Sequence, residues 1–241
     1  MPARKKTPPK PDTSQASLMD VAQHLPTGPC VATLREAVKA WRAGAYKGVT
    51  DTTRALLNFW FCTDHKLPNG HRFEYYLSQR EAIETLIFVW EAERVRTQVD
   101  LLQRYAAPQH GLRLPAHDDF ARYCTKMATG SGKTKVMALA VAWQFLNAMR
   151  ESGPGCEDYA KTFLLIAPNV IVLERLKTDF AGARIFRADP VIPREMEAFW
   201  DFDCVMRDDG ERAHSEGTLF LTNIQQFYER PNRKQDEEPE P

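Results

Sequence analysis

The sequence has no excess of charge of either sign, because 32 Lys and Arg residues balance 32 Asp and Glu residues. A zero net charge gives no global positive field, so any contact with nucleic acid has to come from a local basic patch. The chain also lacks an apolar run of roughly 18 residues, which a membrane helix needs. No apolar stretch follows its basic start. We therefore expect no membrane contact and a cytoplasmic location.

Paired cysteines are lacking as well. The five cysteines are odd in number, widely spread and never spaced as Cys-x-x-Cys, which favours a reducing compartment over a disulfide scaffold. The stretch Cys62-Thr63-Asp64-His65 has the local spacing of metal ligands, but no second pair completes a zinc site. The composition is otherwise that of a soluble globular protein that can bury a core.

Chemistry is concentrated in one stretch, Met127-Ala128-Thr129-Gly130-Ser131-Gly132-Lys133-Thr134. Residues 120–127 mix aromatic, β-branched and apolar types as a strand does, and residues 135–146 are helix formers without a breaker. This order of strand, loop and helix predicts a phosphate-binding loop. Gly130 and Gly132 lack a Cβ, so the backbone can take positive φ and turn successive N–H groups toward an anion.

Two side chains complete the predicted site. A helix that begins near Gly132 adds its positive dipole end, and the Lys133 ammonium can bind the β- and γ-phosphates of a nucleoside triphosphate. The Thr134 hydroxyl can hold a Mg²⁺ ion that bridges these phosphates. We predict that Lys133 is the catalytic residue and that the backbone from Ala128 to Gly132, through Thr129, Gly130 and Ser131, forms the cradle. The alternative is a Gly/Ser turn beside a surface lysine.

This loop resembles the first motif of superfamily 2 DEAD/DEAH-type helicases. It is most similar to the motor (Res or R) subunit of type III and related restriction endonucleases, although the general pattern has glycine where this chain has Met127. The resemblance runs from about residue 73 to 228. It implies an α/β fold, a partial RecA-like P-loop NTPase lobe whose parallel sheet has helices on both faces. It also implies ATP and Mg as cofactors and DNA as the polymer, and it leaves open whether a methyltransferase or specificity subunit is a partner.

A second motif lies upstream of the loop. Residues 77–84 resemble the Q-type motif of the same superfamily, in which a glutamine near a helix start reads adenine. The amide of Gln79 offers a donor and an acceptor side by side, which match N7 and N6 of adenine respectively. By itself, Gln79 would more often be a solvated residue in a first helical turn, and its position upstream of the loop favours the adenine role.

Several helices are expected before the loop. Residues 31–41 place Leu34, Val38 and Trp41 on one helical face, and a second helix begins near Thr50 or Asp51. Ser78-Gln79-Arg80-Glu81 has the form of a capping box, with Ser78 as N-cap and Glu81 reaching back. It predicts a long amphipathic helix that extends through residues 101–102.

Two apolar runs after the loop predict buried parallel strands, Thr162–Ala167 and Thr218–Thr222. Pro168 ends the first strand and Asn169 is the expected N-cap of the next helix. These two junctions resemble motifs Ia and Ic, which makes Pro168, Asn169 and Thr222 candidates for DNA contact. Any strand-to-helix junction would also use a Pro-Asn turn. The aromatic residues of 199–203 are expected in the core rather than stacked on bases.

Hydrolysis in this superfamily uses an apolar strand that ends in Asp-Glu. No such strand occurs: Arg207 precedes Asp208-Asp209, and Asp236-Glu237-Glu238 follows a polar stretch. We therefore expect an N-terminal fragment of a longer motor, not competent for hydrolysis alone, with unpaired strand edges and exposed apolar surface. The alternatives are a non-catalytic nucleotide-binding or interaction remnant, and a small-molecule P-loop kinase or transferase, which Gln79 and residues 167–169 disfavour.

The predicted organisation has four parts: a disordered basic and Pro-rich tail over residues 1–17, a helical N-terminal region over 18–72, the partial RecA-like lobe over 73–230, and a charged tail over 231–241.

Overall fold

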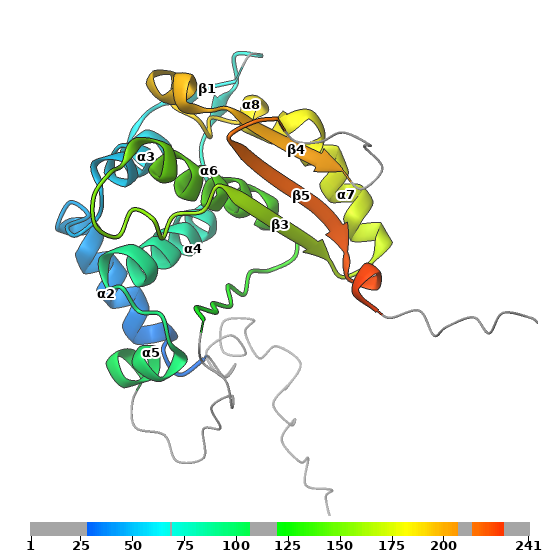
Figure 1. The fold of residues 1–241 in the computed structure, drawn as a ribbon. Helices are drawn as coiled ribbons and strands as arrows, with labels where there is room; N and C mark the ends of the chain where they lie inside the picture. The colour runs from blue at the N-terminus through cyan, green and yellow to red at the C-terminus, as the bar shows by residue number, and fades with distance from the viewer. Residues whose placement is uncertain (1–27, 68, 107–119, 207–213, 229–241) are drawn as a thin grey trace, which may run out of the picture.

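The computed structural model describes residues 28–67, 69–106, 120–206 and 214–228, and Figure 1 shows their arrangement. The predicted tails at residues 1–17 and 231–241 lie outside these ranges, as do the acidic runs 208–209 and 236–238. The α-helices are α2 (Val31–Ala43), α3 (Asp51–Cys62), α4 (Leu77–Ile87), α5 (Gln98–Tyr105), α6 (Lys133–Arg150), α7 (Val170–Phe180) and α8 (Arg184–Ala188). The strands are β1 (His65–Lys66), β2 (Arg72–Phe73), β3 (Thr162–Ala167), β4 (Phe202–Met206) and β5 (Gly217–Asn223). Short helical turns complete the chain, at η2 (Phe88–Ala92), η3 (Ala181–Ala183), η4 (Arg194–Phe199) and η5 (Ile224–Phe227).

The main sheet is parallel and has the strand order β3-β5-β4. Its central strand, β5, is the last of the three in sequence, and Phe220 lies opposite Leu164 on one side and Val205 on the other. Helices pack against the sheet and a helical region precedes it, so the predicted α/β fold is confirmed and is consistent with a RecA-like lobe. The expectation of helices on both faces is not met by the described residues, because one face is exposed. The strands predicted at 162–167 and 218–222 are both present.

The two faces of the sheet differ in burial. Leu219 and Leu221 are buried, and Gly217 leaves room for the Phe145 ring of α6, because a Cβ there would lie 2.3 Å from that ring. On the opposite face Leu164 is 52%, Ile166 47% and Phe220 41% exposed. The prediction that β3 is fully buried is therefore wrong for alternate residues, since among the described residues no element covers that face.

Aromatic rings join α6, α8 and β4 beneath the sheet. The Trp200 and Phe202 rings are stacked at 4.8 Å between centroids, and Phe145 and Phe186 pack within 5.0 to 5.7 Å of Phe202. The prediction that the aromatic residues of 199–203 belong to the core is confirmed for Trp200 and Phe202 and is wrong for Phe199, which is 39% exposed. Strand β4, which begins at Phe202, was not predicted.

The helices α2 and α3 form as predicted. Thr50 is the N-cap of α3, and its hydroxyl accepts a hydrogen bond from the Thr53 N–H at 3.0 Å. Helix α2 packs against α4, and α3 packs against α6. The Trp60 indole donates to the Val191 carbonyl at 2.8 Å, which ties α3 to the segment before η4. One hydrophobic core therefore includes residues of the helical region and of the lobe.

The start of α4 differs from the prediction. The helix begins at Leu77 with Tyr76 as its N-cap, so Ser78 is the second helical residue and cannot cap. The Gln79 carboxamide oxygen takes the role predicted for Glu81, because it accepts the Tyr76 N–H at 2.9 Å.

The predicted long helix through residues 101–102 is interrupted. Helix α4 passes into the π-helical turn η2, and Arg94 then takes a positive φ of 53°. Thr97 caps a separate helix, α5, by accepting the Asp100 N–H at 3.1 Å. A residue in the left-handed region cannot continue a right-handed α-helix, so the helical segment ends before Arg94.

Residues 120–127 do not form the predicted strand. No ladder joins them to β3, β4 or β5 in the part of the chain that the structure describes. The Tyr123 hydroxyl donates to the Val95 carbonyl, so this segment is held by a side chain at that point. Strand-forming residue types become a strand only where a neighbouring strand supplies backbone partners. The loop is therefore entered from an irregular segment.

Over the described ranges, none of the helices combines the length and the apolar character needed to span a membrane.

Candidate functional site

The stretch 128–132 is a tight turn that leads into α6. The Ala128 carbonyl accepts the Ser131 hydroxyl at 2.7 Å and the Ser131 N–H at 3.4 Å. Gly130 and Gly132 have φ of 80° and 79°, and Gly132 is the N-cap of α6. Both torsions lie in the left-handed region, which glycine adopts without steric cost. The turn into a helix that the glycines predict is therefore present.

The backbone of this turn has unused donors. Among the described residues, the N–H groups of Gly130, Gly132, Lys133 and Thr134 have no hydrogen-bond acceptor, whereas Ser131 has one. The first N–H groups of a helix have no partner inside the helix, and they carry its partial positive charge. Four such donors at the start of the 18-residue helix α6 fit an anionic group such as a phosphate.

Lys133 is exposed, and its side chain folds back over the turn. The ammonium Nζ donates to the Met127 carbonyl at 2.9 Å and to the Ala128 carbonyl at 2.7 Å. An anion that lies against the free N–H groups would compete for this ammonium, because the two carbonyl oxygens are neutral whereas an anion adds Coulomb attraction to the hydrogen bond. Thr134, the predicted magnesium ligand, is the next residue and is half-buried.

Gln79 lies directly against the turn although it precedes it by more than 50 residues. Its Nε2 donates to the Ser131 carbonyl at 3.1 Å, and a Cβ on Gly132 would lie 2.1 Å from that nitrogen. The side chain is 2% exposed, so the alternative of a solvated first-turn residue is wrong. The neighbouring Tyr76 and Leu77 are 65% and 64% exposed. The structure therefore brings the predicted Gln79 and the predicted loop together.

The three DNA-contact candidates lie at one edge of the sheet. Thr222 is opposite Ile166, and Pro168 and Asn169 follow β3 directly, so all three are at the carboxyl ends of paired strands. The Asn169 side-chain oxygen accepts the Val172 N–H at 2.9 Å and caps α7, as predicted. This capping role accounts for the Asn169 side chain, and contact with DNA stays a prediction.

An ion pair next to the loop was not predicted. Lys135, two residues after Lys133, pairs with Asp189 and places its ammonium 5.1 Å from the centre of the Phe73 ring. The neighbouring Tyr75 donates to the Pro190 carbonyl at 3.2 Å, and burial, followed by the Asp189 charge, raises the pKa of Tyr75. The sequence carries no local signal for a pair whose members are 54 residues apart.

The Cys62 to His65 stretch does not form a metal site in the structure. The His65 ring is buried, and its Nε2 bonds to the Phe59 carbonyl at 2.7 Å. Within the described ranges, no three His, Cys, Asp or Glu side chains are grouped in a way that could hold a metal ion.

The comparisons with known proteins agree with this geometry. A family model described as "Type III restriction enzyme, res subunit" matches residues 72–240, a range that contains Gln79, the loop and the three strands. No curated protein and no solved structure gave a match. Because the matched range covers more than half of the sequence and includes the loop motif, the chain belongs to the family of type III restriction enzyme res subunits.

Proposed function

We propose that the turn at residues 128–134 binds ATP with Mg²⁺. We further propose that the chain is the ATP-binding part of an ATP-dependent DNA helicase or translocase subunit of a restriction system. The observation that carries the proposal is the set of four N–H groups without acceptors at the start of α6, with the Lys133 ammonium beside them. Membership of the res subunit family supports ATP as the nucleotide and DNA as the polymer.

Each residue has a stated part in the proposed site. The Lys133 ammonium exchanges the Met127 and Ala128 carbonyls for phosphate oxygens, and the free N–H groups of the turn bind the same oxygens. The Thr134 hydroxyl would hold Mg²⁺, which supplies neutralising charge to the phosphates when it is bound. Gln79 would read adenine from its place beside Ser131.

We propose that ATP hydrolysis needs an Asp-Glu pair at the end of a strand, which this sequence lacks. Strand β4 is followed by Arg207 and Asp208, and β5 is followed by Ile224, so neither runs directly into an Asp-Glu pair. We propose that this chain binds ATP without turning it over by itself. The second candidate, a non-catalytic nucleotide-binding module, shares the same site. For this second candidate, we expect that DNA does not change ATP binding.

Substitution of Lys133 tests the nucleotide site. Lys133→Ala removes a charge-assisted contact worth about 1.5–3 kcal/mol, so MgATP affinity should fall roughly 10- to 150-fold in a calorimetric titration. Lys126→Ala is the matched control, because Lys126 is exposed and precedes the turn. Equal affinity of the Lys133→Ala variant and the parent chain would refute the assignment.

Two further measurements test the base preference of the site and its turnover. An adenine-reading Gln79 predicts a strong preference for ATP over GTP, which a small-molecule kinase or transferase does not require. Steady-state phosphate release, measured with and without DNA, tests turnover. DNA-stimulated release would contradict the proposal that the hydrolytic carboxylates are missing, and binding without release would support it.

A further inference from the structure

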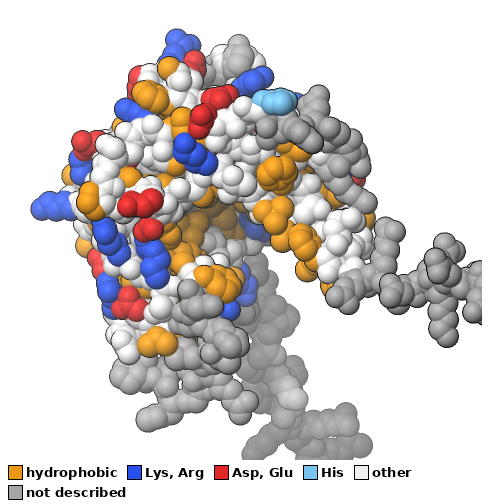
Figure 2. All heavy atoms as spheres, in the orientation of Figure 1, with side chains coloured by type: hydrophobic (Ala, Val, Ile, Leu, Met, Phe, Trp, Pro, Cys, Tyr) orange, Lys and Arg blue, Asp and Glu red, His pale blue; other side chains and the backbone are white. Residues whose placement is uncertain are grey.

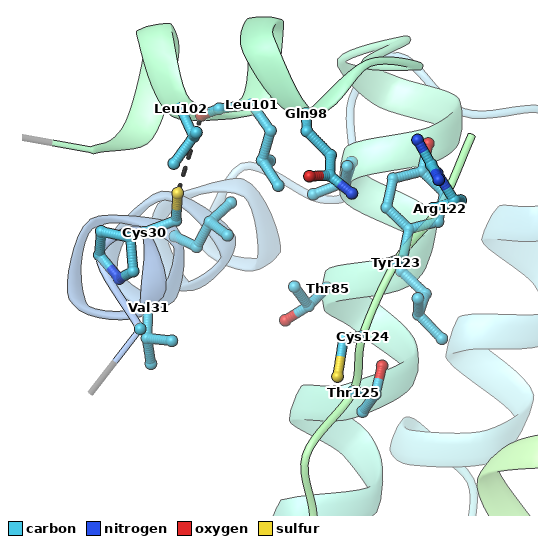
Figure 3. Close-up of a pocket in the computed structure, with 15 residues that line it drawn as sticks. Cys30, Val31, Thr85, Gln98, Leu101, Leu102, Arg122, Tyr123, Cys124 and Thr125 are labelled. Carbon is cyan, nitrogen blue, oxygen red and sulfur yellow. Dashed lines mark hydrogen bonds between the residues drawn. The ribbon is translucent and has the colours of Figure 1, made fainter. Parts of the chain in front are cut away.

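A groove with a volume of about 410 Å³ lies between α2, α4, α5 and residues 122–125 (Figure 3). It is separate from the proposed nucleotide site, because none of residues 127–134 lines it. Its volume falls in the range of roughly 300–1,000 Å³ that is typical of binding sites. The half-buried aliphatic side chains in its lining are Val31, Leu34, Leu86, Leu101 and Leu102. The groove is therefore an apolar surface that the proposed function does not use.

Most of the polar side chains in the lining already have partners. Gln98 and Arg122 both take part in interactions with other residues. The Thr85 hydroxyl donates to the Glu81 carbonyl at 2.6 Å, and the Cys30 thiol donates to a carbonyl of α5 at 3.9 Å (Figure 3). An occupant therefore gains little from polar contacts here, and the groove suits an apolar one.

The part of the chain that the structure describes begins in the wall of this groove, because Gly28 lines it together with Pro29 and Cys30. The residues just before Gly28 therefore start at the rim of the groove. Apolar side chains occur among them at positions i, i+3, i+4 and i+7, which are Leu18, Val21, Ala22 and Leu25. This spacing predicts one apolar face along a helix. An amphipathic helix binds an apolar groove through anchors at these same positions.

The ends of this segment carry helix signals. Ser17 and Asp20 have the spacing of a capping box, and Pro26 follows the last apolar residue. The polar residues Asp20, Gln23 and His24 occupy the opposite face. Residues 18–25 belong to the helical N-terminal region that the sequence predicts, and they lie outside the described ranges. A helix this short is marginal by itself in water, so it needs a surface to pack against.

We propose that residues 18–25 form a helix that packs in this groove, with the four apolar side chains against the aliphatic wall. Leu25 is three residues from Gly28, and three residues span at most about 10 Å, so the helix ends close to the wall. Because residues 123–125 also line the groove, the packed helix lies against the segment that leads into the loop. The occupant is a segment of this chain, and its packing does not rest on the function proposed above.

Limited proteolysis of the full chain tests this packing. Thermolysin cleaves before large apolar residues, so mass spectrometry can follow cleavage of the bonds before Leu18 and Val21. Leu25→Asp places a carboxylate in the apolar face and should speed this cleavage roughly tenfold or more, because cleavage follows the population of the unpacked state. His24→Asp is the matched control, since it introduces the same carboxylate at the neighbouring residue on the polar face. Equal cleavage rates for the two variants would overturn the proposal.

Filling the groove tests whether it is the surface that the segment uses. Leu101→Trp places a larger side chain in the groove and should also speed cleavage before Leu18 and Val21. Gln103→Trp is the control, because Gln103 is an exposed residue of α5 that does not line the groove. Leu34→Phe replaces Leu101→Trp where thermal melting shows that the tryptophan variant does not fold. Protection of the segment that survives a filled groove would refute the packing.

Labelling of Cys124 with iodoacetamide gives an independent measure of the same packing. Cys124 lines the groove and Cys62 does not, and both thiols are exposed. Leu25→Asp should raise the labelling rate of Cys124 relative to Cys62 severalfold, whereas His24→Asp should leave this ratio unchanged. The same ratio in both variants would rule the packing out. Protection of Cys124 that is lost on dilution of the protein would assign the groove to the segment of a second copy and overturn packing within one chain.

Discussion

At the scale of single residues, Gly132 is the position where the loop and Gln79 meet. It has a positive φ of 79°, and a Cβ added there would lie 2.1 Å from Gln79 Nε2. Gly130 has nearly the same φ, 80°, but nothing lies within 4 Å of its would-be Cβ. Comparing an alanine substitution at Gly130 with one at Gly132 therefore distinguishes the cost of backbone strain from the cost of a collision with Gln79.

Gly132→Ala should weaken both folding and nucleotide binding more than Gly130→Ala. Each alanine destabilises the folded state by about 1–2 kcal/mol because of the left-handed backbone. Only the alanine at position 132 also displaces Gln79 from the Ser131 carbonyl. Denaturant unfolding and an ATP titration measure the two effects. In the double variant Gly132→Ala/Gln79→Ala part of the folding loss should return. Identical losses for the two single variants would show that Gln79 does not hold the loop.

Individual residues were predicted best where the rule is local. The N-caps Thr50 and Asn169 were predicted because a short polar side chain before an apolar period satisfies a helix start. The contact between Gln79 and Ser131 depends on how α4 packs against α6, which no local pattern contains. The sequence therefore identifies the candidate residues Gln79 and Ser131 but not the contact between them.

At the scale of elements, Glu91 joins three segments. Its carboxylate is 7% exposed and accepts hydrogen bonds from the Thr50 N–H at 2.6 Å, the Thr53 hydroxyl at 2.8 Å and the Trp143 indole at 2.8 Å. Thr50 and Thr53 belong to the start of α3, and Trp143 belongs to the loop helix α6. A buried carboxylate with three donors is held firmly, and so are the donors.

Glu91→Ala should therefore destabilise the whole chain. It leaves the buried donors of Thr53 and Trp143 and the partly buried Thr50 N–H without their acceptor, so the free energy of unfolding should fall by roughly 3 kcal/mol in urea titrations. Glu93→Ala is the control, since Glu93 is 35% exposed and pairs with Arg104 at the surface, and its loss should stay below about 1 kcal/mol. Similar losses for both variants would contradict the linking role of Glu91.

The α2–α4 junction has a second buried carboxylate, Glu84. It pairs with Arg42 and Arg80, and the Tyr46 hydroxyl donates to it at 2.7 Å. Burial, followed by the hydrogen bond to Glu84, raises the pKa of Tyr46 to about 12 from an ordinary value of 10. The raised pKa means that the folded state keeps the proton where the unfolded state loses it.

This shift gives a pH dependence with a defined sign. The stability due to the protonated Tyr46 is fully present below pH 10 and is lost as the pH rises from about 10 to about 12. Tyr46→Phe should thus be less stable than the parent chain by a constant amount below pH 10, and the difference should shrink above it. Urea titrations at a series of pH values measure this, and a difference independent of pH up to 12 would contradict it.

The elements that were predicted correctly are those with a complete local signal. Helices α2, α3, α6 and α7 and strands β3 and β5 carry continuous periodicity or an apolar run bounded by breakers. Strand β4 was missed because Asp203 interrupts its apolar run, and the strand forms by pairing with β5. The prediction of a strand at residues 120–127 was wrong. Their composition suits a strand, but no strand among the described residues pairs with them.

At the scale of the whole molecule, the sheet has one covered and one uncovered face. Leu164, Ile166 and Phe220 point to the uncovered face, and Figure 2 shows hydrophobic side chains gathered over the region where Figure 1 draws β3 and β5. Exposed apolar surface of this kind promotes association in water. These residues make up the exposed apolar surface that the sequence analysis expects.

Leu164 and its neighbour Leu165 make a matched pair for testing this surface. Alternation along β3 sends Leu164 outward, whereas Leu165 packs against the core. Leu164→Thr keeps strand propensity and removes exposed apolar area, so self-association in sedimentation velocity should decrease while the unfolding free energy stays within about 0.5 kcal/mol. Leu165→Thr should instead cost about 2 kcal/mol of stability and increase association through partial unfolding. If Leu164→Thr left association unchanged, the uncovered face would not be its cause, and the edge of β3 would be the next surface to substitute.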